Sequence, residues 1–120
     1  MDIKKLKKSF HFALSGIDYA LKSDQNLVIH FIVSFILIIA SILLRVTAFE
    51  MGILGMAMVM VVIAEMLNTA IEKMVDLITR EHRNDAKIAK DVSSGMVLLT
   101  VTGAVIIGIL IFLPHVLALF

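Results

Sequence analysis

Three long apolar runs dominate the pattern of hydrophobic and polar positions along this 120-residue chain. They cover residues 27–44, 51–71 and 95–117, and the second run contains Glu65, Asn68 and Thr69 near its end. A helix needs about 20 residues to cross a hydrocarbon layer of about 30 Å. Each run is therefore predicted to be a membrane-spanning helix.

The region before the first run, residues 3–24, has a different pattern. Its apolar residues recur every three or four positions, and most of its charged residues fall between them. Such spacing predicts an amphipathic helix that lies on the membrane surface. Polar residues interrupt the region too often for a signal peptide, so we expect it to be retained. The predicted fold is an all-α integral membrane domain covering residues 1–120.

Composition supports this class and excludes others. The chain is 60% hydrophobic, and a soluble domain of this size could not remove so much apolar surface from water. It contains no Cys, which excludes disulfides, thiolate nucleophiles and sulfur-bound metals. The formal net charge is only +1, which gives no indication of a nucleic-acid partner.

The distribution of Lys and Arg predicts the orientation in the membrane. Ten of the eleven lie before the first run or between the second and third runs, and Arg45 alone lies between the first and second. By the positive-inside rule, the N-terminus and the link between the second and third runs are cytoplasmic. The C-terminus is then outside.

Candidate chemistry begins on the second run, where Glu65, Asn68, Glu72 and Asp76 follow one another at intervals of three, four and four residues. At about 100° per residue these four side chains share one face of a helix, within about 80° of arc. Glu65 lies about 21 Å along the helix from Met51, inside the hydrocarbon layer, and Glu72 lies about 10 Å further on. A carboxylate as deep as Glu65 costs a few kcal/mol, so it is usually functional or paired.

Two interpretations of this carboxylate stripe remain open. Glu65 could be a structural carboxylate that neighbouring polar or basic groups satisfy. Alternatively, Glu72 and another carboxylate could hold Mg²⁺, a hard ion that prefers oxygen, while the desolvated Glu65 acts as a general base. A whole stripe favours the second interpretation.

A second polar face begins the third run. Lys87, Lys90, Asp91 and Ser94 are three or four residues apart, and this face is expected to meet the stripe. Lys87 alone is better explained as a membrane anchor, whereas Lys90 beside Asp91 favours function. Glycine-rich phosphate loops, a Walker lysine and a kinase catalytic loop are missing. Phosphoryl transfer can still be served by Mg²⁺, a Lys and helix-borne polar groups.

Several segments resemble the prokaryotic diacylglycerol kinase family. They are residues 64–72 (AEMLNTAIE), 86–91 (AKIAKD) and 16–26 (GIDYALKSDQN), together with His30. The resemblance extends over most of residues 9–99 and is greatest to the Gram-positive branch, whose members tend to phosphorylate undecaprenol.

The resemblance implies a homotrimer of three-span subunits in the bacterial plasma membrane, with its active site on the cytoplasmic side. Such an enzyme is a lipid kinase that transfers the γ-phosphate of Mg-ATP directly to a lipid hydroxyl. The expected acceptor is undecaprenol, which gives undecaprenyl phosphate. The alternative acceptor is diacylglycerol, which gives phosphatidic acid.

The resemblance also implies roles for individual residues. Glu65 is implied as the catalytic base; Asp24 and Glu72 as metal ligands; Phe12, Asp24, Glu72, Glu81, Lys90 and Asp91 as nucleotide contacts; and Glu65, Asn68 and Ser94 as acceptor contacts. The chain departs from the family in two places. Asp24 stands where Glu is common, and Glu81-His82-Arg83 stands where Glu-Tyr-His is usual.

Two other functional classes explain the sequence less fully. A small proton-coupled transporter would need a carboxylate near the midplane with aromatic walls, but the chain has no Trp and its one Tyr lies outside the spans. A non-catalytic assembly subunit would explain the spans but not Glu65 with Asn68 and Glu72. The lipid kinase explains both features.

Overall fold

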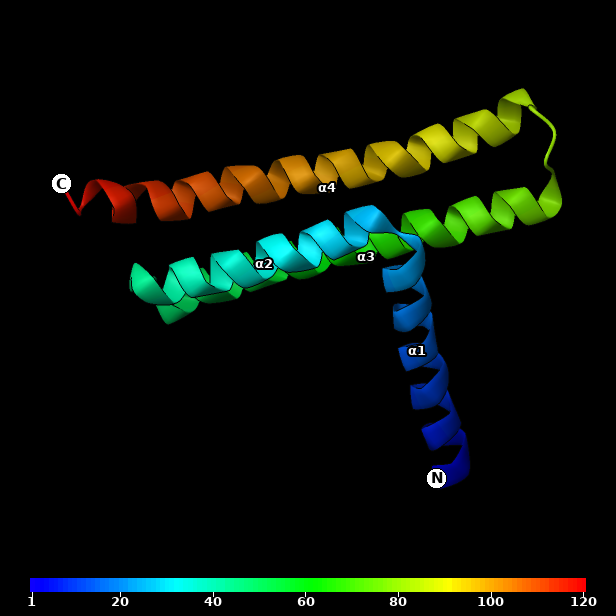
Figure 1. Cartoon of the computed structure of the whole chain (residues 1–120), viewed down its shortest axis with the longest axis horizontal. Helices are drawn as coiled ribbons and strands as arrows, with labels where there is room; N and C mark the ends of the chain where they lie inside the picture. Colours follow the sequence, from blue (N-terminus) through cyan, green and yellow to red (C-terminus); the bar gives the residue numbers. More distant parts are fainter.

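The computed structural model describes residues 1–120 and contains four helices and no strand (Figure 1). In chain order they are α1 (Ile3–Ser23), α2 (Gln25–Leu43), α3 (Ala48–Ile78) and α4 (Asn84–Leu117). The last three are long and apolar enough to cross a membrane. The predicted all-α membrane fold, with one amphipathic helix before three spans, is confirmed.

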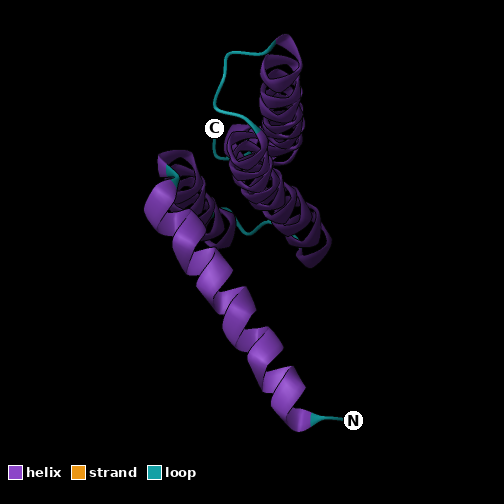
Figure 2. Ribbon diagram, turned by 90° about the vertical axis from the view of Figure 1, so that its right-hand side faces the viewer, coloured by secondary structure: helices purple, strands orange, loops and turns teal.

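Asp24 forms the corner between α1 and α2. It ends α1, and its side chain Oδ1 accepts hydrogen bonds from the backbone N–H groups of Asn26 (2.9 Å) and Leu27 (3.4 Å) at the start of α2. Asp is a favoured residue at this capping position. The chain turns sharply here, so α1 leaves the other three helices at a steep angle (Figures 1 and 2).

Helices α3 and α4 are longer than the spans expected from the apolar runs. The 19 residues of α2 extend about 28 Å, whereas α3 has 31 residues and α4 has 34. Past the corner at Asp24, both α3 and α4 continue, and α4 also extends beyond α2 at its C-terminal end (Figure 1). The polar extension past the corner carries Glu72 and Asp76 of α3 and the first turns of α4.

Helix α3 is central, because it packs against both α2 and α4. Its buried apolar residues are Leu54, Ala57, Val61 and Ala64, which recur every three or four positions. Only ten of the 120 residues are buried, so most apolar side chains of the spans face outward. That surface suits contact with lipid or with further helices.

At the end opposite the corner, α3 and α4 are joined by a pair of side chains. Thr47 and Glu50 form a capping box at the start of α3. Both carboxylate oxygens of Glu50 lie 3.2 Å from Nε2 of His115, in the last turns of α4. This pair fixes the relative position of the two helix ends.

Candidate functional site

Glu65 is enclosed within the single chain. Its residue is only 3% exposed, and its Oε1 lies 3.2 Å from Nε2 of His30 on α2. An ionised carboxylate, the form that a base requires, only accepts hydrogen bonds, and Nε2–H of His30 is the donor to that form. The deepest carboxylate of the stripe therefore faces α2.

Asp24, at the corner, lies beside this pair and contacts α3 about one turn beyond Glu65. Its Oδ2 accepts a hydrogen bond from Oγ1 of Thr69 on α3 (3.1 Å), while its Oδ1 caps α2. The carboxylates of Asp24 and Glu65 are close enough to interact. The α1–α2 corner is thus fastened to α3 at Thr69, which places Glu65 about 6 Å deeper along the helix.

Asn68 connects the stripe to α4. Its Oδ1 accepts from Oγ of Ser93 (2.7 Å), and its Nδ2 donates to Oε1 of Glu72 (3.4 Å). The sequence had indicated Ser94 for this face, but Ser94 is exposed and makes no hydrogen bond in the chain, whereas Ser93 is buried. Adjacent helical residues differ by about 100°, so one position decides which serine meets α3.

The polar extension brings three of the predicted nucleotide contacts to one place. Glu81, Lys90 and Asp91 line a polar cavity of about 450 Å³ between the ends of α3 and α4. Nζ of Lys90 donates to Oδ1 of Asp76 (2.6 Å), and Nζ of Lys87 donates to Oδ2 of Asp91 (2.5 Å). All four charged side chains remain well exposed, so they can exchange these partners for phosphate oxygens.

Phe12 is not brought to the other candidates within one chain. Its ring is exposed on α1, twelve residues and about 18 Å before Asp24, and α1 points away from the other helices (Figure 1).

Asp24 and Glu72, the two predicted metal ligands, have few other metal-binding side chains around them. No group of three or more Asp, Glu or His side chains gathers anywhere in the chain to form a complete metal site. However, Asp24 contacts Thr69, which is three residues before Glu72, so Asp24 meets α3 about one turn from Glu72. Mg²⁺ is commonly held by one or two carboxylates, with substrate phosphates and water completing its shell. The donors fit such an ion.

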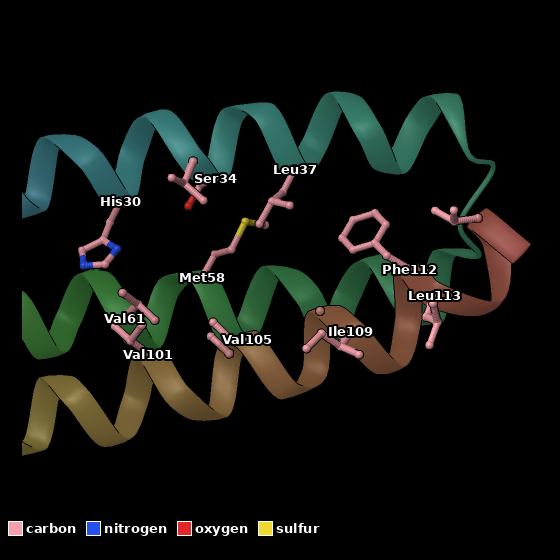
Figure 3. A pocket seen from close by; sticks show the side chains of 14 residues that line it. His30, Ser34, Leu37, Met58, Val61, Val101, Val105, Ile109, Phe112 and Leu113 are labelled. Atoms are coloured by element: carbon pink, nitrogen blue, oxygen red, sulfur yellow. The ribbon is translucent and has the colours of Figure 1, made fainter.

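An apolar groove ends at His30, the residue that contacts Glu65. It encloses about 550 Å³ between α2 and α4 over α3, and 11 of its 14 lining residues are hydrophobic. His30 marks the end near Glu65, and Phe112 and Leu113 lie toward the other end (Figure 3). Besides His30, the only lining side chain with a hydrogen-bond donor is Ser34. A hydrocarbon chain could occupy this groove with its polar end at the buried carboxylate.

The fold and this site define a class: a small membrane protein with three spans and a buried carboxylate, Glu65, near one end of the spans. Residues 11–112 match the model of the prokaryotic diacylglycerol kinase family. The chain belongs to this family, which confirms the resemblance, the predicted class of lipid kinase and ATP as the phosphate donor that this class implies.

Two relatives carry informative names. A protein of Synechocystis named diacylglycerol kinase is 39% identical over 112 residues, which cover 92% of this chain and 64% of that protein. A protein of Bacillus subtilis named undecaprenol kinase is 35% identical over 113 residues, covering 94% of this chain and 92% of that protein. The chain thus spans less than two thirds of the first relative and nearly all of the second.

Proposed function

We propose that this protein transfers the γ-phosphate of ATP directly to the hydroxyl of undecaprenol, giving undecaprenyl phosphate and ADP. The observation that carries the proposal is a buried carboxylate, Glu65, in contact with His30, which lines one end of an apolar groove. A polar extension follows on the same helix. An alcohol acceptor with a long hydrocarbon tail fits this combination of an apolar groove and a base.

In the proposed reaction, the tail of the acceptor lies in the groove and its hydroxyl reaches Glu65. Glu65 accepts the hydroxyl proton while the hydroxyl oxygen attacks the γ-phosphorus and the bond to the β-phosphate oxygen breaks. No phosphorylated enzyme forms. Lys90 would leave Asp76 to neutralise the nucleotide phosphates, and Asn68 would orient Glu72 through their hydrogen bond.

Asp24 and Glu72 would hold Mg²⁺ against the nucleotide, with Glu81 and Asp91 as further nucleotide contacts. The ion would supply positive charge to the transferred phosphoryl group. Asp has a shorter side chain than the Glu common in the family, but its contact with Thr69 already brings it to α3.

The choice of undecaprenol over diacylglycerol rests on the donors in the groove. Diacylglycerol has ester carbonyls near its hydroxyl that need hydrogen-bond donors when buried, whereas a prenol has none. His30 already donates to Glu65, which leaves Ser34 as the one unengaged donor in the lining. The relative of nearly equal length is also named undecaprenol kinase.

We expect kcat/KM for undecaprenol to exceed that for diacylglycerol by about tenfold or more, which corresponds to about 1.4 kcal/mol of transition-state binding. Purified protein in one detergent, with each lipid in turn and saturating Mg-ATP, provides the measurement. Ser34→Ala serves as the matched variant, because it should lower activity on diacylglycerol only. A tenfold preference for diacylglycerol would overturn the choice of acceptor.

We propose the same orientation as the charge distribution indicates, with the N-terminus and active site cytoplasmic and the C-terminus outside. The corner at Asp24 and the α3–α4 link lie toward the same end of the molecule (Figure 1). Ten of the eleven Lys and Arg lie either on α1, before the corner, or in residues 73–90, which include the link. One-sided labelling of single Cys substitutions in this Cys-free chain would test it.

We further propose that the working unit is a homotrimer whose sites are shared between subunits. Asp76, which holds Lys90, lies eleven residues or about 17 Å along α3 from Glu65. Phe12 and Ser94 lie on surfaces that face away from Glu65 in their own chain, and the spans leave most apolar side chains uncovered. Neighbouring subunits would cover those surfaces and complete the site.

Mixing Glu65→Gln subunits with Lys90→Ala subunits is expected to give more activity than either variant alone. If a site takes Glu65 from one subunit and Lys90 from its neighbour, some mixed trimers contain one unaltered centre made from both kinds of chain. The measurement is activity after co-refolding, against each variant refolded alone. Full activity in a cross-linked preparation that is entirely monomeric would contradict the proposal.

A further inference from the structure

His30 has no role in the reaction as proposed above, although it lies next to the proposed base. It lies on α2 where the apolar groove ends (Figure 3), and Nε2 of its ring lies 3.2 Å from Oε1 of Glu65. Its side chain is 22% exposed, whereas that of Glu65 is 3% exposed. His30 therefore contacts both the groove and the buried carboxylate.

The contact involves one oxygen of Glu65 and leaves the other available. Oε1 lies 3.2 Å from Nε2 of His30, and no donor in the chain reaches Oε2. No buried side-chain oxygen in the molecule lacks a partner, so Oε2 retains some accessible surface. A carboxylate with one oxygen fixed presents the second in a defined direction, which is the requirement for a base that must meet a single hydroxyl.

The charges around Glu65 give His30 a second effect. The nearest other charged group is the carboxylate of Asp24, which repels a negative Glu65. The basic residues closest along α3 and α4 are engaged elsewhere, because Lys73 lies over the ring of Tyr19 and Lys90 donates to Asp76. His30 is thus the one donor that can hold Glu65 in place against this repulsion.

We propose that His30 is a positioning residue for phosphoryl transfer: its Nε2–H fixes Oε1 of Glu65, so that Oε2 faces the hydroxyl of a lipid alcohol emerging from the groove. This inference rests on the proposed function and adds to it a residue that acts through the base. His30 itself exchanges no proton with the substrate.

The chain contains a matched control. His115 and Glu50 form another His–Glu pair at the same distance of 3.2 Å, also with the Glu on α3, but at the opposite end of that helix. A general loss of stability from breaking such a pair should appear in both His→Ala variants. A positioning role should appear only at His30.

The experiment compares His30→Ala, His30→Gln and His115→Ala for turnover, KM for ATP and thermal unfolding. His30→Ala should lower kcat by about 10-fold to 100-fold with KM for ATP changed less than about twofold, the pattern of a group that acts in the transition state. His30→Gln, which keeps a donor, should regain most of that loss. His115→Ala should keep normal turnover.

Combining His30→Ala with Glu65→Gln separates positioning from a structural role. If His30 acts through Glu65, the double variant should be no less active than Glu65→Gln alone, because coupled residues are non-additive. Additive losses, or normal turnover in His30→Ala, would overturn the inference. An inactive wild-type protein would instead overturn the proposed function.

A readout independent of activity completes the test. Labelling of Glu65 by a hydrophobic carbodiimide, followed by mass spectrometry, should be several-fold faster in His30→Ala than in the wild type, because Oε1 is then free to react. The rate in His115→Ala should be unchanged. Equal rates in all three proteins would show that His30 does not restrain Glu65.

Discussion

Glu65→Gln is expected to lower turnover by about 10²-fold to 10⁴-fold while Mg-ATP still binds. This is the usual contribution of a positioned general base, and Gln keeps the size and hydrogen-bonding capacity of the side chain but cannot accept the proton. Because three of the proposed nucleotide contacts, Glu81, Lys90 and Asp91, lie in the polar extension, KM for ATP should change little. Steady-state kinetics and a nucleotide-binding assay on the same preparation provide the measurement.

Glu50→Gln is the control for this variant. Glu50 is on the same helix and also accepts from a histidine, but it lies at the far end of α3 from the groove mouth. It should retain nearly full turnover. Turnover within about threefold of the wild type in Glu65→Gln would remove Glu65 from the role of base.

Glu72→Gln is expected to raise the Mg²⁺ concentration needed for half-maximal activity by about tenfold or more, because an amide is a weaker ligand for a hard cation than a carboxylate. Loss of even an outer-shell partner typically costs a metal site about 10-fold to 100-fold. Titrating activity with Mg²⁺ at fixed ATP measures the effect. An unchanged Mg²⁺ requirement would exclude Glu72 as a ligand.

Asp24 needs a more careful variant, because it has two structural contacts besides its proposed metal role. Asp24→Ala would also remove the cap of α2, which is worth about 1 kcal/mol, whereas Asn caps a helix as well as Asp does. Asp24→Asn should therefore reproduce the Mg²⁺ effect of Glu72→Gln without loss of thermal stability. Asp18→Asn, an exposed change on α1, is the control.

The helices and the order of the spans could be predicted because both depend on local pattern. Apolar run length fixes the number of spans, and the spacing of Glu65, Asn68 and Glu72 fixes their common face. The extent of α3 and α4 was underestimated, since the apolar run ends where the hydrocarbon ends but the helix continues into water. Polar residues with good helix propensity, such as Glu72, carry it on.

The partners of the site residues could not be predicted in the same way. Helical spacing does not determine how one helix is rotated against the next. Spacing groups Ser94 with Lys87, Lys90 and Asp91, but it does not predict that Ser93 is the residue that reaches Asn68. Likewise, His30 is identified in the sequence only as part of the family resemblance. A His four residues before Ser34 in a mostly apolar run could by itself have indicated a polar site on this helix. Its contact with Glu65 depends on the packing of α2 on α3.

The groove could not be predicted for a related reason. Its walls come from three helices, and its apolar residues are of the same types as those that face lipid. The lining is poor in hydrogen-bond donors, which only His30 and Ser34 provide. The position of the groove, ending at the histidine that contacts Glu65, is a property of the packing alone.

The most direct test of the account follows the phosphate itself. Purified protein is incubated with Mg²⁺, ATP labelled at its γ-phosphate and undecaprenol, and the label is then separated into lipid, inorganic phosphate and protein. The account predicts label in undecaprenyl phosphate in step with ADP formation, with none bound to the protein at any time. Absence of label from every lipid alcohol offered, or its accumulation on the protein before it reaches the lipid, would contradict it.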